Sequence, residues 1–179
     1  MSLEKENVKL RAVEPADLEN LYAWENNISV WKVSQTISPF SKYTLKEYCA
    51  YANTDIQTSK QLRLMIDVND NGTFVSVGMV DLFDYDAVNR RAGIGILIGN
   101  EMYRQMGIAT LSIEIILNYC FNILNLHQVH CFVGEKNTAS LELFQKLKFQ
   151  SCGVIKDWLL FSNAWEDVLF LQRINNLEK

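Results

Sequence analysis

The sequence has few of the features that mark membrane, secreted or fibrous proteins. It contains two prolines and four cysteines in 179 residues. It has no run of about eighteen apolar residues, the length that spans a bilayer. Its start, MSLEKENVK, is polar and lacks the apolar stretch of a signal peptide. We therefore expect a cytoplasmic protein that does not engage a membrane.

Cysteine and histidine do not form a recognisable metal site or disulfide framework. No Cys-x-x-Cys occurs, and the two histidines, His127 and His130, do not stand with cysteines at zinc-site spacing. The cysteines are far apart, and each has apolar or aromatic neighbours, which favours buried free thiols in a reducing compartment over disulfides. These four residues are Cys49, Cys120, Cys131 and Cys152. We expect no bound metal.

Positive charge is scarce and scattered. Seventeen lysines and arginines stand against 21 acidic residues, for a net charge of −4 and a pI near 5.2. A nucleic-acid-binding protein normally has a basic patch, so we expect no nucleic acid partner. The mild acidity is compatible with a cationic partner. Apolar residues make up 49% of the chain, which excludes an intrinsically disordered protein.

No repeat or Pro/Gly/Ser-rich linker divides the chain, so residues 1–179 are predicted to form a single domain. Pro15 suits the first turn of a helix that runs through ADLENLYAWE. A short helix around Ser29–Val33 and a third helix over Leu45–Thr58 are predicted next. In QLRLMIDV, the alternation from Leu62 to Val68 indicates a half-buried strand.

The rest of the chain reads as strands and two helices. Two more strands, TFVSVGMVDLF and RRAGIGILIG, are predicted after the strand at Leu62. Short turns at Asn69–Gly72 and Asp86–Asn89 join the three strands, so neighbouring strands should be antiparallel. The helix after Gly107 has one thin polar stripe and should lie across a sheet. HQVHCFVG is predicted to be the next strand. A helix capped by Asn137 and two closing strands follow it. This order predicts an α/β (α+β) three-layer fold, with a mixed, mostly antiparallel sheet of about seven strands and helices on both faces.

The stretch YRQMGIATLSI can bind an anion. Gly107 begins the long helix, so the unpaired N–H groups of its first turn and the helix dipole suit a phosphate. Arg104 adds positive charge, and Ala109 keeps the next turn clear. An ordinary loop-to-helix junction explains the same residues, because a single glycine is a weak signal.

With its context, this stretch resembles the GNAT superfamily of acetyl-CoA-dependent N-acetyltransferases. Their pyrophosphate loop, Gln/Arg-x-x-Gly-x-Gly/Ala, is matched by Arg104, Gly107 and Ala109. A second block, Asn137-x-x-Ser140-x-x-x-Phe144-x-Lys146-Leu147-x-Phe149, is similar to the family's asparagine, amphipathic helix and closing Leu-Gly-Phe. The resemblance covers essentially the whole chain. It looks closest to the branch of ribosomal-protein N-terminal acetyltransferases and spermidine N-acetyltransferase.

The resemblance implies an enzyme that transfers the acetyl group of acetyl-CoA to a primary amine in a ternary complex. Backbone groups of Leu97 and Ile98 would hold the pantetheine arm and polarise the thioester carbonyl. Asn137 would bond to pantetheine, and Phe144 would lie near the sulfur. The pyrophosphate would be held by the loop and first helical turn: Arg104, Gln105, Met106, Gly107, Ile108, Ala109 and Thr110.

Two proton-transfer groups of many relatives are absent. Gly93 and Phe144 stand where those relatives have a glutamate and a tyrosine. Ser140 could protonate the CoA thiolate, or it could satisfy an early-helix N–H group. Asp81 could act as a base through water, or it could be a solvated strand end. The same departures motivate an alternative function, a catalytically weakened acyl-CoA sensor.

The sequence leaves several candidates for the acceptor amine and for the residues that bind it. Asp84 and Glu166 could attract an ammonium, and Trp31 belongs to a group of early aromatics that could form a cation–π wall, although helix packing explains that group as well. The segment KVSQTISPF lacks the acidic residues of spermidine acetyltransferases, so polyamines, other small amines and protein N-termini all remain as acceptors. The resemblance also implies self-association, because members of this branch often form dimers or larger assemblies. It therefore predicts a homodimer or a higher homo-oligomer.

Overall fold

The computed structural model describes residues 2–34, 36–51, 54–161 and 163–175. Eight strands form one sheet in the order β1-β2-β3-β4-β5-β6-β8-β7. Neighbouring strands are antiparallel except β5 and β6, which are parallel. This confirms the predicted fold class, with one strand more than the seven expected. The strands are β1 Glu4–Lys5, β2 Val8–Ala12, β3 Leu62–Asp70, β4 Thr73–Asp86, β5 Arg91–Ile98, β6 Gln128–Gly134, β7 Gln150–Phe161 and β8 Ala164–Ile174.

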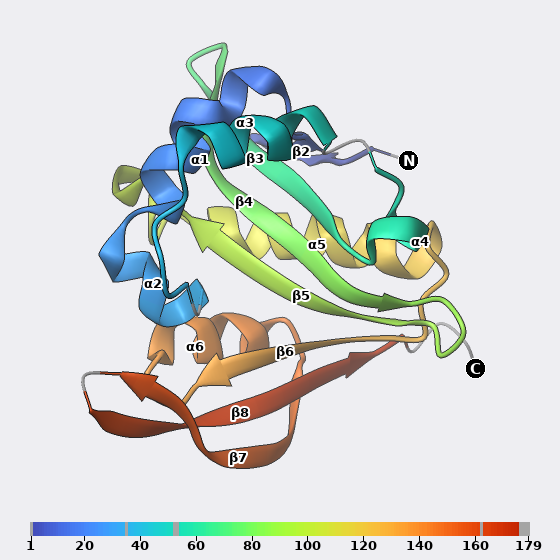
Figure 1. Ribbon diagram of the computed structural model, residues 1–179. Helices are drawn as coiled ribbons and strands as arrows, with labels where there is room; N and C mark the ends of the chain where they lie inside the picture. The colour runs from blue at the N-terminus through green and yellow to red at the C-terminus, as the bar shows by residue number, and fades with distance from the viewer. Residues whose placement is uncertain (1, 35, 52–53, 162, 176–179) are drawn as a thin grey trace.

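Helices cover both faces of the sheet (Figure 1). On one face, α1 and α3 pack over Met65 and Met79 through Leu21, Trp24 and Leu45. On the other face, α5 crosses the sheet and buries most of its surface in the larger core, as its thin polar stripe predicts. The helices are α1 Leu18–Glu25, α2 Ile28–Ser34, α3 Lys42–Tyr51, α4 Ile56–Ser59, α5 Ile108–Asn122 and α6 Thr138–Lys146, with 3-10 turns η1 Pro15–Asp17 and η2 Glu101–Tyr103.

The parallel strands β5 and β6 separate soon after they meet. Within the described residues they pair at three positions, from Arg91–Gly93 to Gln128–His130. Beyond these pairs β5 continues along β4 as far as Ile98, whereas β6 continues along β8 (Figure 1). The sheet therefore opens into a V between two strands that are each held on their outer side.

A network around Arg11 fixes the start of α1 to the sheet. The Arg11 guanidinium donates to both Asp17 carboxylate oxygens at 2.7 Å and to Asp67 Oδ2 at 2.6 Å. Burial by itself would raise the pKa of the Asp17 carboxyl, but the bonds from Arg11 and from the Glu14 N–H outweigh burial and lower it. Pro15 begins η1 next to this network, so the predicted helix start is confirmed.

Three predictions about burial and helix length are wrong. The strand at Leu62 is buried on both faces, because α1 and α3 cover the side that carries Met65 and Asp67. The predicted helix over Leu45–Thr58 is two helices, α3 and α4, with Asp55 as the N-cap of the second. Cys152 is exposed on β7, although the other three cysteines are buried and all four are free thiols.

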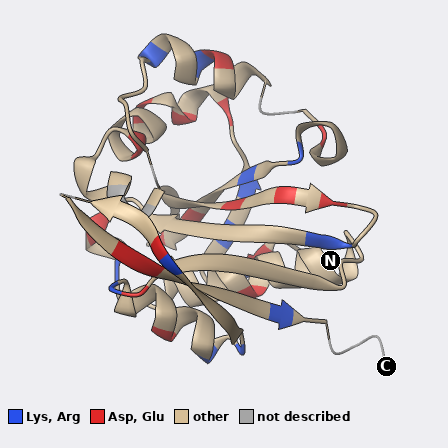
Figure 2. Ribbon diagram, turned by 60° about the horizontal axis from the view of Figure 1, so that its bottom comes forward, with Lys and Arg blue, Asp and Glu red and all other residues tan. Residues whose placement is uncertain are grey.

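Charged residues are spread over many elements (Figure 2). Lysines and arginines do not gather on one face of the ribbon in that view, as their scatter in the sequence suggests. Among the helices that the structure describes, none is long and apolar enough to cross a membrane.

Candidate active site

The loop between β5 and α5 has the backbone geometry of an anion site. Gly107 is the N-cap of α5 with a φ of 79°, the left-handed region that glycine enters at little cost. A Cβ added there would meet nothing within 4 Å, so the space beside it is open. The first helical bond runs from Leu111 N–H to the Gly107 carbonyl at 3.1 Å. The N–H groups that precede it, from Ile108 to Thr110, point out of the helix end, where the dipole favours phosphate oxygens.

Arg104 ties this loop to the end of β5. Its Nε donates to the Ile98 carbonyl at 3.1 Å, and its Nη1 pairs with Glu101 Oε1 at 3.1 Å. The guanidinium is therefore held at the end of β5, and the side chain stays 41% exposed. Gln105, next in the loop, has a φ of 61°. Two left-handed residues, Gln105 and Gly107, thus turn the chain sharply into α5.

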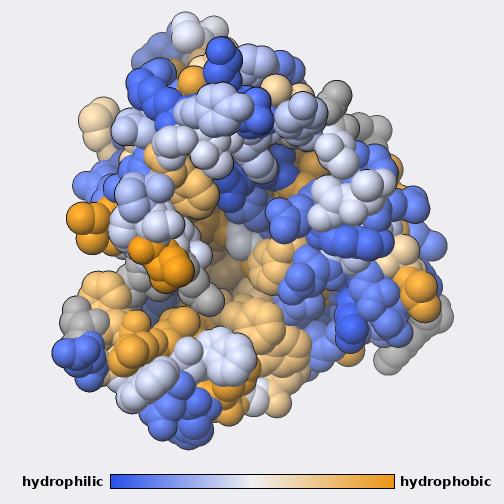
Figure 3. Space-filling model, viewed as in Figure 1, coloured by the Kyte–Doolittle hydropathy of each residue, from blue (hydrophilic) through white to orange (hydrophobic). Residues whose placement is uncertain are grey.

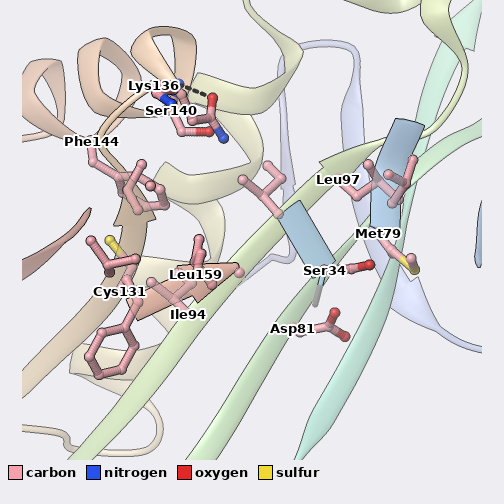
Figure 4. A pocket seen from close by; sticks show the side chains of 18 of the residues that line it. Ser34, Met79, Asp81, Ile94, Leu97, Cys131, Lys136, Ser140, Phe144 and Leu159 are labelled. Atoms are coloured by element: carbon pink, nitrogen blue, oxygen red, sulfur yellow. Dashed lines mark hydrogen bonds between the residues drawn. The ribbon is translucent and has the colours of Figure 1, made fainter. Parts of the chain in front are cut away.

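The V between β5 and β6 holds a pocket of about 390 Å³, which we call the acceptor pocket. One wall comes from Ile94–Leu97 of β5 and the opposite wall from Cys131–Gly134 of β6. Figure 3 shows the molecule hollowed in this region, and Figure 4 shows Leu97 and Cys131 on opposite sides. Because the two strands have separated here, β5 backbone groups that face β6 are available to a ligand.

Helix α6 places Ser140 and Phe144 on the pocket wall (Figure 4). Asn137 is its N-cap and accepts the Ser140 N–H at 3.2 Å, which confirms the predicted cap. Phe144 is 3% exposed and packs edge-on against Phe149, with ring centroids 4.9 Å apart. Asn137, Ser140 and Phe144 therefore meet at one end of the pocket, beside β6.

A salt-bridged group, here called the Arg63 cluster (Glu25, Arg63 and Asp81), lines the same pocket. Arg63 donates to Asp81 Oδ1 at 2.6 Å and to Asp81 Oδ2 at 3.0 Å, and it also donates to Glu25. Burial by itself would lower the pKa of the guanidinium, but the two carboxylates outweigh burial and raise it. Arg63 is thus a permanent cation with two carboxylates around it.

Glu166 projects from β8 into the pocket and is 6% exposed. Its Oε1 accepts the Lys136 N–H at 3.1 Å. A Cβ on Gly134 would come within 2.6 Å of the same oxygen. Glycine at position 134 therefore allows the carboxylate to lie across the end of β6.

Comparison with known proteins identifies the family to which this chain belongs. The model of the acetyltransferase (GNAT) domain matches residues 7–150. The chain belongs to the GNAT acetyltransferase family. It is therefore an N-acetyltransferase that uses acetyl-CoA, and the sensor alternative is not favoured. The anion loop, the open V and the Asn137 cap fit that cofactor, whose diphosphate, amide-rich arm and thioester need backbone N–H and C=O partners.

Named relatives carry the same fold and an amine-directed activity. Spermidine N(1)-acetyltransferase of Escherichia coli K12 is 27% identical over 163 residues, covering 91% of this chain and 83% of the relative. The Vibrio cholerae enzyme of that name is 25% identical, and the match covers 89% of this chain and 88% of the relative. The structure is similar to that of the V. cholerae spermidine N-acetyltransferase in complex with CoA and spermine, with a TM-score of 0.84 over 95% and 96% of the chains at 23% identity.

Two predicted acceptor-side residues of this GNAT enzyme lie outside the pocket wall. Trp31 is half-buried, and its indole donates to the Glu25 carbonyl at 2.8 Å, which links α2 to α1. Asp84 is exposed, with a φ of 49°, at a register shift of β4. The pocket brings together Asp81, Leu97, Asn137, Ser140, Phe144 and Glu166 among the predicted site residues.

Sequence reasoning missed Glu25, Arg63 and Lys136, which also line the acceptor pocket. In the sequence, Arg63 stands where an alternating strand has a solvent-facing residue. Glu25 stands at the end of a helix, where an exposed acid is common. Their pairing joins residues 38 positions apart, so no local pattern reveals it. The only local signal is a charged residue within Leu62–Ile66, a run that is otherwise apolar.

Gly93, at which the family resemblance predicts a glutamate in many GNAT enzymes, faces an aromatic ring. A Cβ on Gly93 would come within 2.2 Å of the Phe83 ring, whereas a Cβ on Gly95 would be 3.9 Å from the same ring. Phe83 therefore fills the space that a side chain at position 93 would need.

This contact predicts a difference in stability between two alanine variants. Gly93→Ala should lower the free energy of unfolding by about 1–3 kcal/mol, because the new methyl group overpacks against Phe83. The matched Gly95→Ala variant should change it far less, and Gly93→Ala combined with Phe83→Leu should recover part of the loss. Urea unfolding measures all three. Equal stability of the two alanine variants would contradict the packing of Phe83 over Gly93.

Proposed function

We propose that the enzyme acetylates a primary amine of a polyamine by direct attack on acetyl-CoA. The observation that carries this proposal is the presence of three carboxylates, Glu25, Asp81 and Glu166, in the pocket that also contains Ser140. Carboxylates attract an ammonium electrostatically, and they do so more strongly where water is partly excluded. The spermidine acetyltransferases among the relatives support the same acceptor class.

The cofactor side is assigned as the sequence motifs suggest. The N–H groups from Gln105 to Thr110, with Arg104 beside them, hold the diphosphate. Backbone groups of Leu97 and Ile98 and the Asn137 side chain orient the pantetheine arm and thioester. Phe144 packs near the sulfur without exchanging a proton. The open space at Gly107 and the separated β5 edge support this assignment.

Proton transfer is divided among the remaining polar groups. The amine must lose a proton before its nitrogen lone pair attacks the thioester carbon, and the C–S bond then breaks to release a thiolate. Ser140 donates a proton to that thiolate and is reprotonated by the second proton that the amine nitrogen loses as the amide forms. The proton of the ammonium passes through water toward the pocket carboxylates. Asp81 is held in place by two bonds from Arg63, which supports a role in binding the ammonium.

We also propose that residues 1–179 act as one catalytic domain in the cytoplasm and assemble as a homodimer or larger homo-oligomer. One continuous sheet from β1 to β8 supports a single unit, and four free thiols support a reducing compartment. The exposed apolar side chains of the β7–β8 hairpin, Trp158, Leu160 and Trp165, support association with another copy.

The experiment is an acceptor panel in which CoA thiol release from acetyl-CoA is followed. Spermidine, spermine and 1,4-diaminobutane should show the highest kcat/KM, ahead of amino acids and peptide N-termini. A preference for peptides would overturn the polyamine assignment. Thermal stabilisation by acetyl-CoA, about 2.7 kcal/mol at 100 times its Kd, without CoA release from any amine would instead support a binding module.

A further inference from the structure

A second cavity adjoins the acceptor pocket across the Arg63 cluster. It measures about 340 Å³, and we call it the side chamber. Its lining includes Glu25, Arg63 and Asp81, the same three residues that line the acceptor pocket. The cluster therefore stands between two spaces, one of which leads to Ser140 while the other runs under α3.

The walls of the side chamber combine aromatic rings with negative charge. Phe40, Tyr48 and Phe83 supply the rings. The charged residues among its described lining are Glu25, Asp81 and Arg63, two carboxylates against one guanidinium, which leaves a net charge of −1. The Arg63 side chain is also stacked over the Tyr48 ring, 5.5 Å from its centroid, which keeps the guanidinium against one wall.

The carboxylates retain capacity for another donor. A carboxylate has about four acceptor sites, and Arg63 makes two bonds to Asp81 and one to Glu25. An ammonium on a methylene chain suits this combination, because aromatic faces attract both the cation and its alkyl stem. A neutral or anionic group would leave the excess charge of the cluster uncompensated.

We infer that the side chamber receives the distal ammonium of the acceptor, while the reacting amine lies in the acceptor pocket near Ser140. This inference rests on the proposed polyamine activity and extends it. The Arg63 cluster then lies between the two nitrogens, where its carboxylates can accept hydrogen bonds from the distal ammonium, and it favours linear acceptors that carry a second positive charge. Monoamines occupy only the acceptor pocket and gain nothing from the chamber.

Gln61 provides the test, because it lines the side chamber only, is exposed and lies outside the Arg63 cluster. Gln61→Lys should raise the KM for spermidine about two- to fivefold, and Gln61→Glu should lower it by a similar factor, the range expected for partly exposed charges. The kcat should not change. Butylamine, followed as a substrate or as a competitor of spermidine, should respond to neither variant.

The matched control is Gln57→Lys on α4, which makes the same change of charge at an exposed residue outside both cavities. It should leave the KM for spermidine unchanged. Equal KM changes for spermidine and butylamine, or none for either, would overturn the side chamber while leaving the polyamine activity intact. Failure of the wild-type enzyme to acetylate any polyamine would overturn the proposed function itself.

Discussion

Acetyl-CoA affinity is expected to fall about 100-fold or more when Gly107 is replaced by glutamate, since like charges brought together cost several kcal/mol. The new side chain starts in the open space beside the first turn of α5. Its carboxylate would compete with the diphosphate for the N–H groups from Ile108 to Thr110 and would repel it. Isothermal titration with acetyl-CoA measures the change.

The matched control is Gly72→Glu. Gly72 has a φ of 91°, a Cβ there also meets nothing within 4 Å, and the residue lies in the turn between β3 and β4. Both variants carry a glutamate in a left-handed conformation and should lose similar stability, on the order of 1 kcal/mol. Only Gly107→Glu should lose the cofactor. Retained affinity in that variant would remove the loop from the binding site.

The rate of acetyl transfer is expected to fall on the order of 100-fold in kcat when Ser140 is replaced by alanine, the lower end of the usual contribution of a general acid. The hydroxyl lies on the pocket wall beside Phe144, which cannot donate a proton. The Ser140 N–H still bonds to Asn137 in the variant, because that bond uses the backbone. Acetyl-CoA affinity should therefore stay the same.

Thr138→Ala is the control for this experiment. It removes an exposed hydroxyl from the same turn of α6, outside the acceptor pocket. Its kcat should match that of the wild-type enzyme. Stopped-flow measurement of a single turnover separates chemistry from product release. An unchanged single-turnover rate in Ser140→Ala would exclude the serine and point to water as the proton donor.

The two capped helix starts assigned to the cofactor could be predicted from sequence because their determinants are local. Gly107 directly precedes the helix that it caps, and Asn137 and Ser140 are only three positions apart. Each motif needs only a short segment to adopt its standard conformation. The family resemblance added the order of the two blocks, and residues 7–150 match the family.

The Arg63 cluster could not be predicted, because it is assembled from distant segments. Arg63 is paired with Asp81 and Glu25, which lie 18 and 38 positions away, so its burial depends on how α1 covers β3. The same helix covers the face of β3 that carries Met65, so the alternation of apolar and polar residues around Met65 wrongly predicts a half-buried strand. The contact of Phe83 with Gly93 likewise depends on the register of β4 and β5.

The separation of β5 from β6 leaves the enzyme with a strand edge in the interior of its sheet. Such an edge has unpaired N–H and C=O groups and is normally a site where another extended chain can add. The pantetheine arm, with its two amides, can act as a short surrogate strand along Ile94–Ile98. Saturation with the donor should therefore slow amide hydrogen exchange along β5, and an enzyme without its donor should be the form more prone to aggregate.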